Sequence, residues 1–132
     1  MVPIFKIANE LNIKVYLAKL SKEISGAILK KNNNYVIYVN ESDDENRQRF
    51  TVAHEIAHYI LHRKYIEDNL TDNAMYRSRL SNTKELQADV LASEILIPIG
   101  KLREILKEGN YNIDYLAGVF RVSRDDINTP AR

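Results

Sequence analysis

The sequence predicts an α+β fold, with a small antiparallel sheet early in the chain followed by a series of helices. Short apolar segments flank the three asparagines at 32–34, as they do in a β-hairpin. From about residue 41 onward the apolar residues recur with helical spacing instead. At 132 residues, the chain is expected to form one domain over 1–132.

The N-terminal third predicts one helix and three strands. Residues 3–11 place a proline in the first turn and apolar side chains on one face, which is typical of a helix. Residues 13–17 alternate apolar and polar side chains, as in a strand. The segments 24–30 and 35–40 form the expected hairpin, since asparagine tolerates the left-handed backbone of a tight turn.

The remainder predicts helices. The stretch ESDDENRQRFTVAHEIAHYILHR, residues 41–63, opens with serine and aspartate as candidate N-caps and continues with apolar residues at helical spacing. Residues 64–82 are polar and read as a long loop. Residues 83–97 are helical again and end before a proline. Two shorter helices are expected over 99–107 and 113–120.

The composition excludes several classes of protein. Hydrophobic residues make up 45% and charged residues 28% of the chain, and the formal net charge is +1. No strongly basic field therefore favours nucleic acid as a partner. The chain has no cysteine, which excludes disulfides and thiolate metal sites. No apolar run resembles a signal peptide or a membrane span, so a soluble, cytoplasmic protein with no membrane partner is expected.

All three histidines lie within nine positions, and two of them form the motif HEIAH with a glutamate. On a helix, His54 and His58 lie on the same face one turn apart, so both imidazoles reach one metal ion. Glu55 then stands beside the metal site as a base for a water molecule, whose pKa Zn²⁺ lowers from about 15.7 to about 7. The alternative is an amphipathic helix that carries two histidines by chance.

His62 follows one further turn along this face. Positions i, i+4 and i+8 span about 12 Å of helix, too far to converge on one tetrahedral ion. His62 is therefore expected near the helix C-terminus, where an imidazole suits the helix dipole. A role facing the substrate is the alternative.

The third metal ligand is expected to be a carboxylate. Glu85 is favoured because Asp89 lies one turn later and can accept the free N–H of a ligand histidine. A two-histidine, one-glutamate site leaves a fourth position open, as catalysis requires. Two alternatives remain: Glu85 can belong to a capping box with Asn82 as N-cap, and Glu94 is a competing carboxylate.

Two blocks of sequence resemble the ImmA/IrrE-type metallopeptidases: RQRFTVAHEIAHYILHR and KELQADVLASEILIP. The segments SGAILKKNNNYVIYVN and LAGVFRVS are also similar to that family. Leu91 stands where the family often has phenylalanine, and Ala57 where it often has glycine. The resemblance implies a zincin-like fold, with His54, His58 and Glu85 as zinc ligands and Glu55 as general base. It also implies a protein substrate, a helix-turn-helix repressor whose cleavage releases transcription.

A peptidase also needs a donor that stabilises the oxyanion of the transition state. The sequence offers four candidates and does not choose among them: Tyr59, Tyr65, Tyr76 and Arg77. The loop 64–82 could act as a lid over the cleft. The 35–40 strand, if it lies at an edge of the sheet, could pair with an extended substrate.

Two rival functions remain open. The segment YLAGVFRVSRDDI resembles part of a helix-turn-helix, which would make the protein a DNA-binding regulator. Its second helix would be short and contains Pro130, and basic residues are few, so direct nucleic-acid binding is not favoured. The other rival is a regulatory or toxin-like partner protein that has the same fold and binds zinc, but whose proteolysis is latent or absent.

Overall fold

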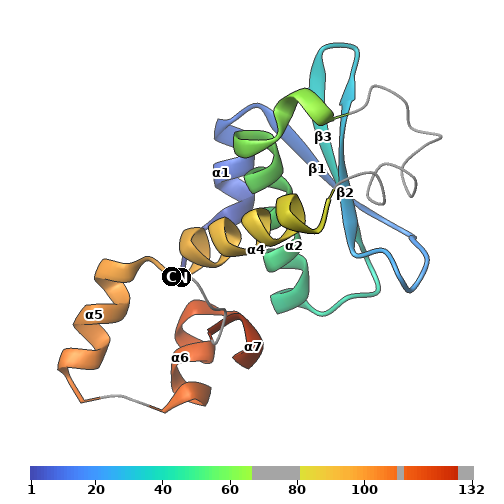
Figure 1. Cartoon of the computed structure of the whole chain (residues 1–132). Helices are drawn as coiled ribbons and strands as arrows, with labels where there is room; N and C mark the ends of the chain where they lie inside the picture. The colour runs from blue at the N-terminus through green and yellow to red at the C-terminus, as the bar shows by residue number, and fades with distance from the viewer. Residues whose placement is uncertain (67–80, 110–111, 128–132) are drawn as a thin grey trace.

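The computed structural model describes residues 1–66, 81–109 and 112–127. Its fold class is α+β, as predicted: two helices pack against a three-stranded sheet, a third helix packs against one of these, and the last helices of the chain lie at the far end of the molecule (Figure 1). The elements in chain order are α1 (Ile4–Glu10), β1 (Ile13–Ala18), β2 (Gly26–Lys31), β3 (Asn34–Asn40), α2 (Glu45–Leu61), η1 (Arg63–Tyr65), α4 (Asn82–Leu96), α5 (Ile99–Lys107), α6 (Ile113–Phe120) and α7 (Arg124–Ile127). The expected loop over 64–82 falls mostly outside the described residues.

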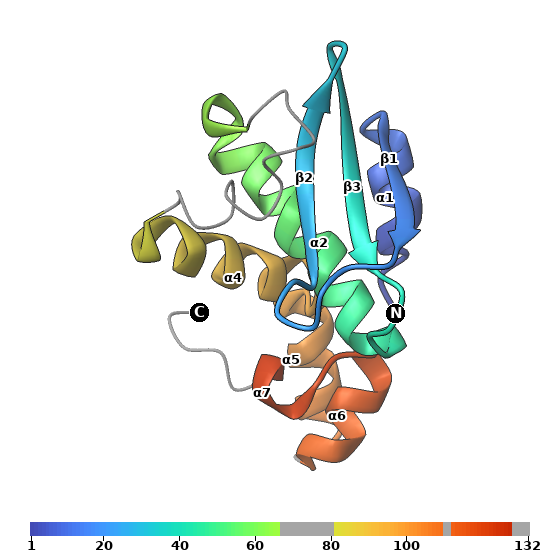
Figure 2. The same ribbon diagram turned by 90° about the vertical axis from the view of Figure 1, so that its right-hand side faces the viewer.

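The sheet is mixed rather than wholly antiparallel. β2 and β3 form the predicted antiparallel hairpin, with Asn32 and Asn33 at positive φ in its turn. β1 pairs with β3 in parallel, so the strand order is β1-β3-β2 (Figure 2). The chain reverses direction twice between β1 and β3, and therefore these two strands run the same way. β3 is the central strand, so the suggestion that residues 35–40 form an edge that binds substrate is wrong.

The core lies between the sheet and α2. Apolar side chains from the inner face of each strand are buried, including Ile13, Ile28 and Ile37. They pack in one cluster with Ile56 of α2 and Leu96 of α4. Burying side chains of this size stabilises a fold by roughly 1.5–3 kcal/mol each. The predicted helical period of α2 and α4 thus reflects two helices that share one core.

Gly26 sets the distance between β2 and α2. A Cβ atom at this position would lie 2.5 Å from the Thr51 side chain and 2.5 Å from the Tyr38 carbonyl oxygen. Real Cβ atoms do not tolerate such separations, so only glycine lets the edge strand approach the helix this closely. The contact falls one turn before the histidine motif.

Asn40 fastens the connection between β1 and β2 to the rest of the domain. It is buried, and its side-chain amide lies 3.0–3.3 Å from the carbonyl oxygens of Leu20, Ser21 and Ile24. Its side-chain oxygen accepts the Ser42 N–H at 3.0 Å. The Asn40 side chain therefore supplies hydrogen bonds to backbone carbonyl groups in a connection that lacks regular backbone pairing.

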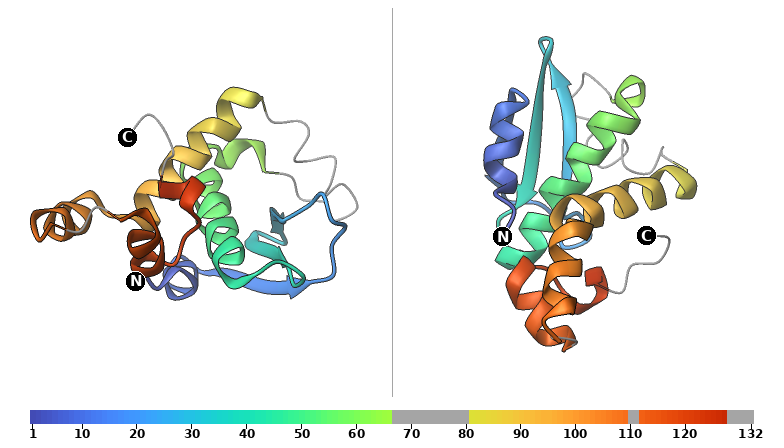
Figure 3. Two further views of the ribbon diagram at one scale, coloured as in Figure 1. Left: turned by 90° about the horizontal axis from the view of Figure 1, so that it is seen from below. Right: turned by 90° about the vertical axis from the view of Figure 1, so that its left-hand side faces the viewer.

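The end of α6 lies against the N-terminal half of α2 (Figure 3). The buried Arg49 guanidinium donates to the carbonyl oxygens of Phe120 and Arg121 at the end of α6. Burial lowers the pKa of Arg49, while Glu45 partly opposes this shift. Arg121 adopts a left-handed backbone and pairs with Glu45 at 2.8 Å. The end of α6 is thereby fixed to the first half of α2.

Candidate metal centre

α2 presents the histidine motif from within the core. Asp44 caps the helix by accepting the Arg47 N–H at 2.8 Å, in line with the expected aspartate N-cap. His54 is 6% exposed, and Glu55 and His58 are both fully buried. Burying a carboxylate costs free energy unless its surroundings compensate it. Packing alone would therefore not favour a glutamate at position 55.

α4 brings a carboxylate to this face. Its N-cap is Ser81, whose hydroxyl accepts the Lys84 N–H at 3.2 Å, and the helix begins at Asn82. The interpretation of Asn82 as the N-cap of a capping box is therefore wrong. With Ser81 as cap, Glu85 is the fourth helical residue, one position beyond the place from which a capping-box side chain reaches back. Its carboxylate instead turns toward α2.

Three ligand atoms converge between the two helices. Glu85 Oε1 lies 3.0 Å from His54 Nε2, and Glu85 Oε2 lies 3.2 Å from His58 Nε2. The two Nε2 atoms are 3.1 Å apart. Four ligands placed tetrahedrally at about 2.0–2.2 Å from a zinc ion stand roughly 3.3–3.6 Å from one another. The observed spacings are close to that value, so these residues fit a metal ion.

The small residues of both helices allow this convergence. Ala57 on α2 and Ala88 on α4 are each fully buried, and the two helices pack against each other. Small side chains at a helix crossing allow the two axes to approach. The alanine at position 57, where the resembled family often has glycine, is compatible with this packing.

Asp89 lies against the other nitrogen of His54. Its Oδ1 is 2.8 Å from His54 Nδ1, while its side chain is 46% exposed. A carboxylate that accepts the Nδ1–H leaves Nε2 free for a metal. The structure thus places Asp89 where the sequence expected it, behind a histidine of the metal group.

His62 is the C-cap residue of α2, and its ring lies on the far side of His58 from the metal group. The two Nδ1 atoms are 3.0 Å apart, and His62 Nε2 lies 2.8 Å from Gln87 Oε1. The ring is 5% exposed. A role facing the substrate does not fit a buried ring whose two nitrogens both have partners.

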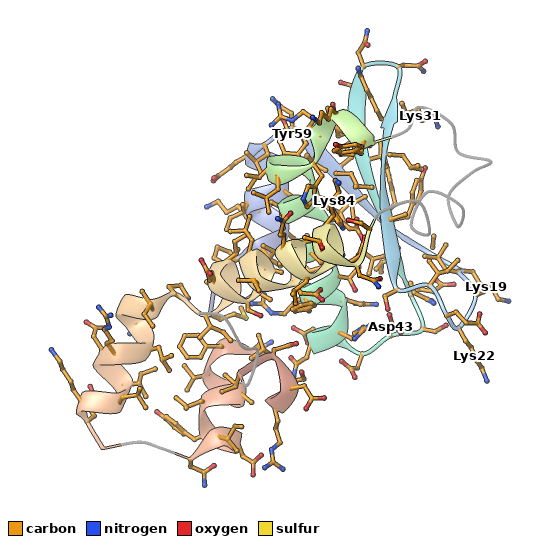
Figure 4. All side chains as sticks on the ribbon, in the orientation of Figure 1. Lys19, Lys22, Lys31, Asp43, Tyr59 and Lys84 are labelled. Carbon is orange, nitrogen blue, oxygen red and sulfur yellow. The ribbon has the colours of Figure 1, made fainter. Side chains whose placement is uncertain are left out.

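The four candidates for oxyanion stabilisation separate into two groups. Tyr76 and Arg77 lie outside the described residues, as does most of the suggested lid. Tyr59 packs edge-on against Tyr35, with ring centres 4.9 Å apart, and its face carries the Arg63 guanidinium at 3.9 Å (Figure 4). Its ring is therefore occupied by packing.

Tyr65 is the better placed of the two described tyrosines. Its ring lies 4.6 Å from the Lys84 ammonium at the start of α4, and 42% of the residue is exposed. Lys84 directly precedes Glu85 in the sequence. A half-exposed phenol is available to a bound peptide.

The alternative ligand Glu94 is exposed on α4 and does not join the group. Within the described ranges, the His, Cys, Asp and Glu side chains close enough to share one metal ion are His54, His58 and Glu85, whose ligand atoms all lie within 4.8 Å of one another. Sequence reasoning missed Gln87, because a glutamine on an exposed helix face gives no signal by itself. Its spacing gave no clue either, because residues two apart on a helix lie on nearly opposite faces.

The arrangement defines a class of protein. Two histidines one turn apart on a helix and a carboxylate from a second helix form the ligand set of the two-histidine, one-glutamate metallopeptidases, and a further glutamate follows the first histidine in the sequence. The described part of the chain also contains no helix that is long and apolar enough to cross a membrane.

The comparisons assign the chain more closely. Residues 8–128 match the model of the IrrE N-terminal-like domain, and the chain belongs to this ImmA/IrrE family of metallopeptidases. It is 29% identical over 96 residues to Metallopeptidase ImmA of Bacillus subtilis (strain 168). The aligned region covers 70% of this chain and 54% of that protein. The chain therefore spans about half the length of that curated relative.

A solved structure has the same fold. The Mycobacterium tuberculosis transcriptional regulator superposes with a TM-score of 0.67, at 15% sequence identity, over 94% of this chain and 38% of that chain. At this identity the likeness concerns the fold alone.

Proposed function

We propose that this domain is a zinc-dependent endopeptidase that cleaves a helix-turn-helix transcriptional repressor. The observation that carries the proposal is the convergence of His54, His58 and Glu85, with the buried Glu55 next to His54 in the sequence. Membership of the ImmA/IrrE metallopeptidase family supports the reaction class. The repressor as substrate, and with it a cytoplasmic location, follows from the family resemblance of the sequence.

The roles of the side chains follow from their placement. The two histidines and Glu85 would hold the zinc ion, which supplies Lewis acidity toward a water molecule and the peptide carbonyl. Glu55 would take a proton from that water and return it to the leaving amine. Asp89 would keep His54 in the tautomer that leaves Nε2 bare. Tyr65 is the described side chain best placed to donate to the oxyanion.

The DNA-binding alternative is not favoured by the described residues. Two of the described residues of α7, where a recognition helix would lie, are Asp125 and Asp126. Adjacent carboxylates repel a phosphate backbone. A gel shift with duplex DNA is expected to show no specific complex.

The test is a comparison of the wild type with Glu55→Gln. Both proteins should contain about one zinc per chain by elemental analysis, since Glu55 is not a ligand. The wild type should cleave the repressor encoded beside its gene, with products identified by mass spectrometry. The variant should be slower by about 10²–10⁴-fold, the usual contribution of a general acid–base.

The two rivals give different results in that experiment. A zinc-loaded wild type that leaves the repressor intact, alone and together with the other proteins encoded nearby, would identify a zinc-containing binding protein instead. Equal cleavage by wild type and Glu55→Gln would remove Glu55 from the mechanism. A wild type that takes up no zinc would contradict the metal site itself.

A further inference from the structure

A hydrogen-bonded chain leads away from the metal group on the side of His58. His58 Nδ1 lies 3.0 Å from His62 Nδ1, and His62 Nε2 lies 2.8 Å from Gln87 Oε1. Both rings are almost fully withdrawn from water, at 0% and 5% exposure. The chain therefore begins at a metal-ligating side chain and ends at an amide on the other ligand-bearing helix.

Its geometry follows from the helix. His58 and His62 are four residues apart, so their side chains lie one above the other on the same face of α2. His62 also donates its backbone N–H to the His58 carbonyl oxygen at 2.7 Å, and it is the residue at which α2 ends. Gln87 lies two residues after Glu85 on α4 and contacts the other nitrogen of the His62 ring. The second helix thus fixes both the metal group and this chain.

The positions of the protons can be derived by following the chain outward. A metal on His58 Nε2 requires that nitrogen to be bare, so the ring proton must sit on Nδ1. That Nδ1–H donates to His62 Nδ1, which must then be bare. The proton of His62 sits on Nε2 and donates to Gln87 Oε1, which accepts it. Each atom has one role, and no donor faces another donor.

The two metal histidines are therefore supported differently. His54 has the carboxylate of Asp89 on its Nδ1 at 2.8 Å, and this group is 46% exposed. His58 has the buried imidazole of His62 in the same position. A carboxylate only accepts, so it selects the tautomer alone. An imidazole and an amide can each donate or accept, so the direction of this chain is set at its inner end. The proton on His58 Nδ1 makes His62 accept at Nδ1, and the Gln87 oxygen then accepts from His62 Nε2.

We propose that His62, oriented by Gln87, is a positioning residue of the metal site. Its Nδ1 accepts the Nδ1–H of His58 and so holds the His58 ring in the tautomer and orientation that bind the ion. This inference rests on the metal site of the proposed function and does not depend on proteolysis or on the identity of the substrate.

The experiment compares two variants of the whole chain that both remove the second imidazole. His62→Asn places an amide oxygen close to the position of the lost Nδ1, whereas His62→Leu fills the space with no acceptor. Zinc affinity is measured by competition with a chromogenic chelator. His62→Leu is expected to bind zinc about 10- to 100-fold more weakly than the wild type, the usual effect of removing such a partner, and His62→Asn within about threefold of it.

A structural role for His62 would give another pattern. Thermal unfolding of the metal-free proteins shows what each variant loses in packing. The two variants should unfold at similar temperatures although they differ in zinc affinity. Wild-type affinity in His62→Leu, or equal weakening in both variants, would overturn the proposal.

A second measurement uses the wild type and avoids variants altogether. Ring ¹⁵N–¹H spectra of the zinc-loaded protein distinguish the two tautomers of each histidine. They should show His58 with its proton on Nδ1 and His62 with its proton on Nε2. A proton on His62 Nδ1 would overturn the proposal while leaving the metal site intact. Absence of zinc binding by the wild type would instead contradict the site on which both proposals rest.

Discussion

α2 and α4 contribute to the same group of ligands in different ways. The residues from α2 are buried between the sheet and α4: His54, Glu55 and His58 are at most 6% exposed. The side chains from α4 are partly in solvent, with Glu85 at 28% and Asp89 at 46%. Core packing therefore fixes the side chains of α2, while hydrogen bonds to these histidines orient the side chains of α4. Substitutions on α2 should disturb both folding and metal binding, whereas substitutions on the outer face of α4 should affect only one of the two.

The largest effect is expected from a core residue of α2. Ile56 is 1% exposed and packs in the cluster shared with the sheet. Truncation by Ile56→Ala removes apolar surface and leaves a cavity, which should lower the free energy of unfolding by about 2–5 kcal/mol. Urea unfolding of the metal-free protein measures this. A loss below 1 kcal/mol would show that α2 is less firmly held than its burial indicates.

The ligand on α4 should affect metal binding without affecting the fold. Glu85→Ala removes one of three ligands, so zinc affinity should fall by more than about 100-fold, beyond the 10- to 100-fold effect typical of groups behind the ligands. The free energy of unfolding of the metal-free protein should change by about 1 kcal/mol or less. Glu94→Ala, on the same helix, is the matched control and should bind zinc as the wild type does. Zinc retained by Glu85→Ala would move the third ligand elsewhere.

A smaller effect is expected behind His54. Asp89→Asn keeps the shape of the side chain but can present an N–H in place of an acceptor, so the tautomer of His54 is no longer fixed. Zinc affinity should fall by about 10- to 100-fold. Chelator competition measures this, with Asp89→Glu as the control that keeps the carboxylate. If Asp89→Asn and the wild type bind zinc equally, His54 does not depend on this partner.

The smallest effect should come from the outer face of α4. Leu86 is 54% exposed, so Leu86→Ala should change the free energy of unfolding by only about 0.5 kcal/mol. Urea unfolding beside Ile56→Ala gives the contrast directly. A loss of unfolding free energy comparable to that of Ile56→Ala would mean that Leu86 is buried. The contrast between a buried α2 and a partly exposed α4 would then be wrong.

The local features of this domain were predictable from the sequence, because each depends on neighbouring residues. Helical spacing indicated the helices that became α2 and α4. It also placed His54 with His58 on one face of the first helix, and Glu85 with Asp89 on one face of the second. The N-cap of α4 was misplaced by one residue, since Ser81 and Asn82 are both good caps and only the structure separates them. The rest depends on contacts between distant segments. The parallel pairing of β1 with β3, the links from Asn40 and the meeting of His62 with Gln87 all require the tertiary arrangement.

The close approach at Gly26 has a consequence for how the family can vary. Two groups occupy the space of a Cβ atom there: the Thr51 side chain and the Tyr38 carbonyl oxygen. A smaller residue at position 51 would remove the first obstacle, but no substitution removes a backbone carbonyl. We therefore expect related chains to keep glycine at this position whatever stands opposite it, so that the position is invariant and shows no covariation. A sequence alignment of relatives would test this, and frequent alanine at this position paired with a smaller residue opposite would contradict it.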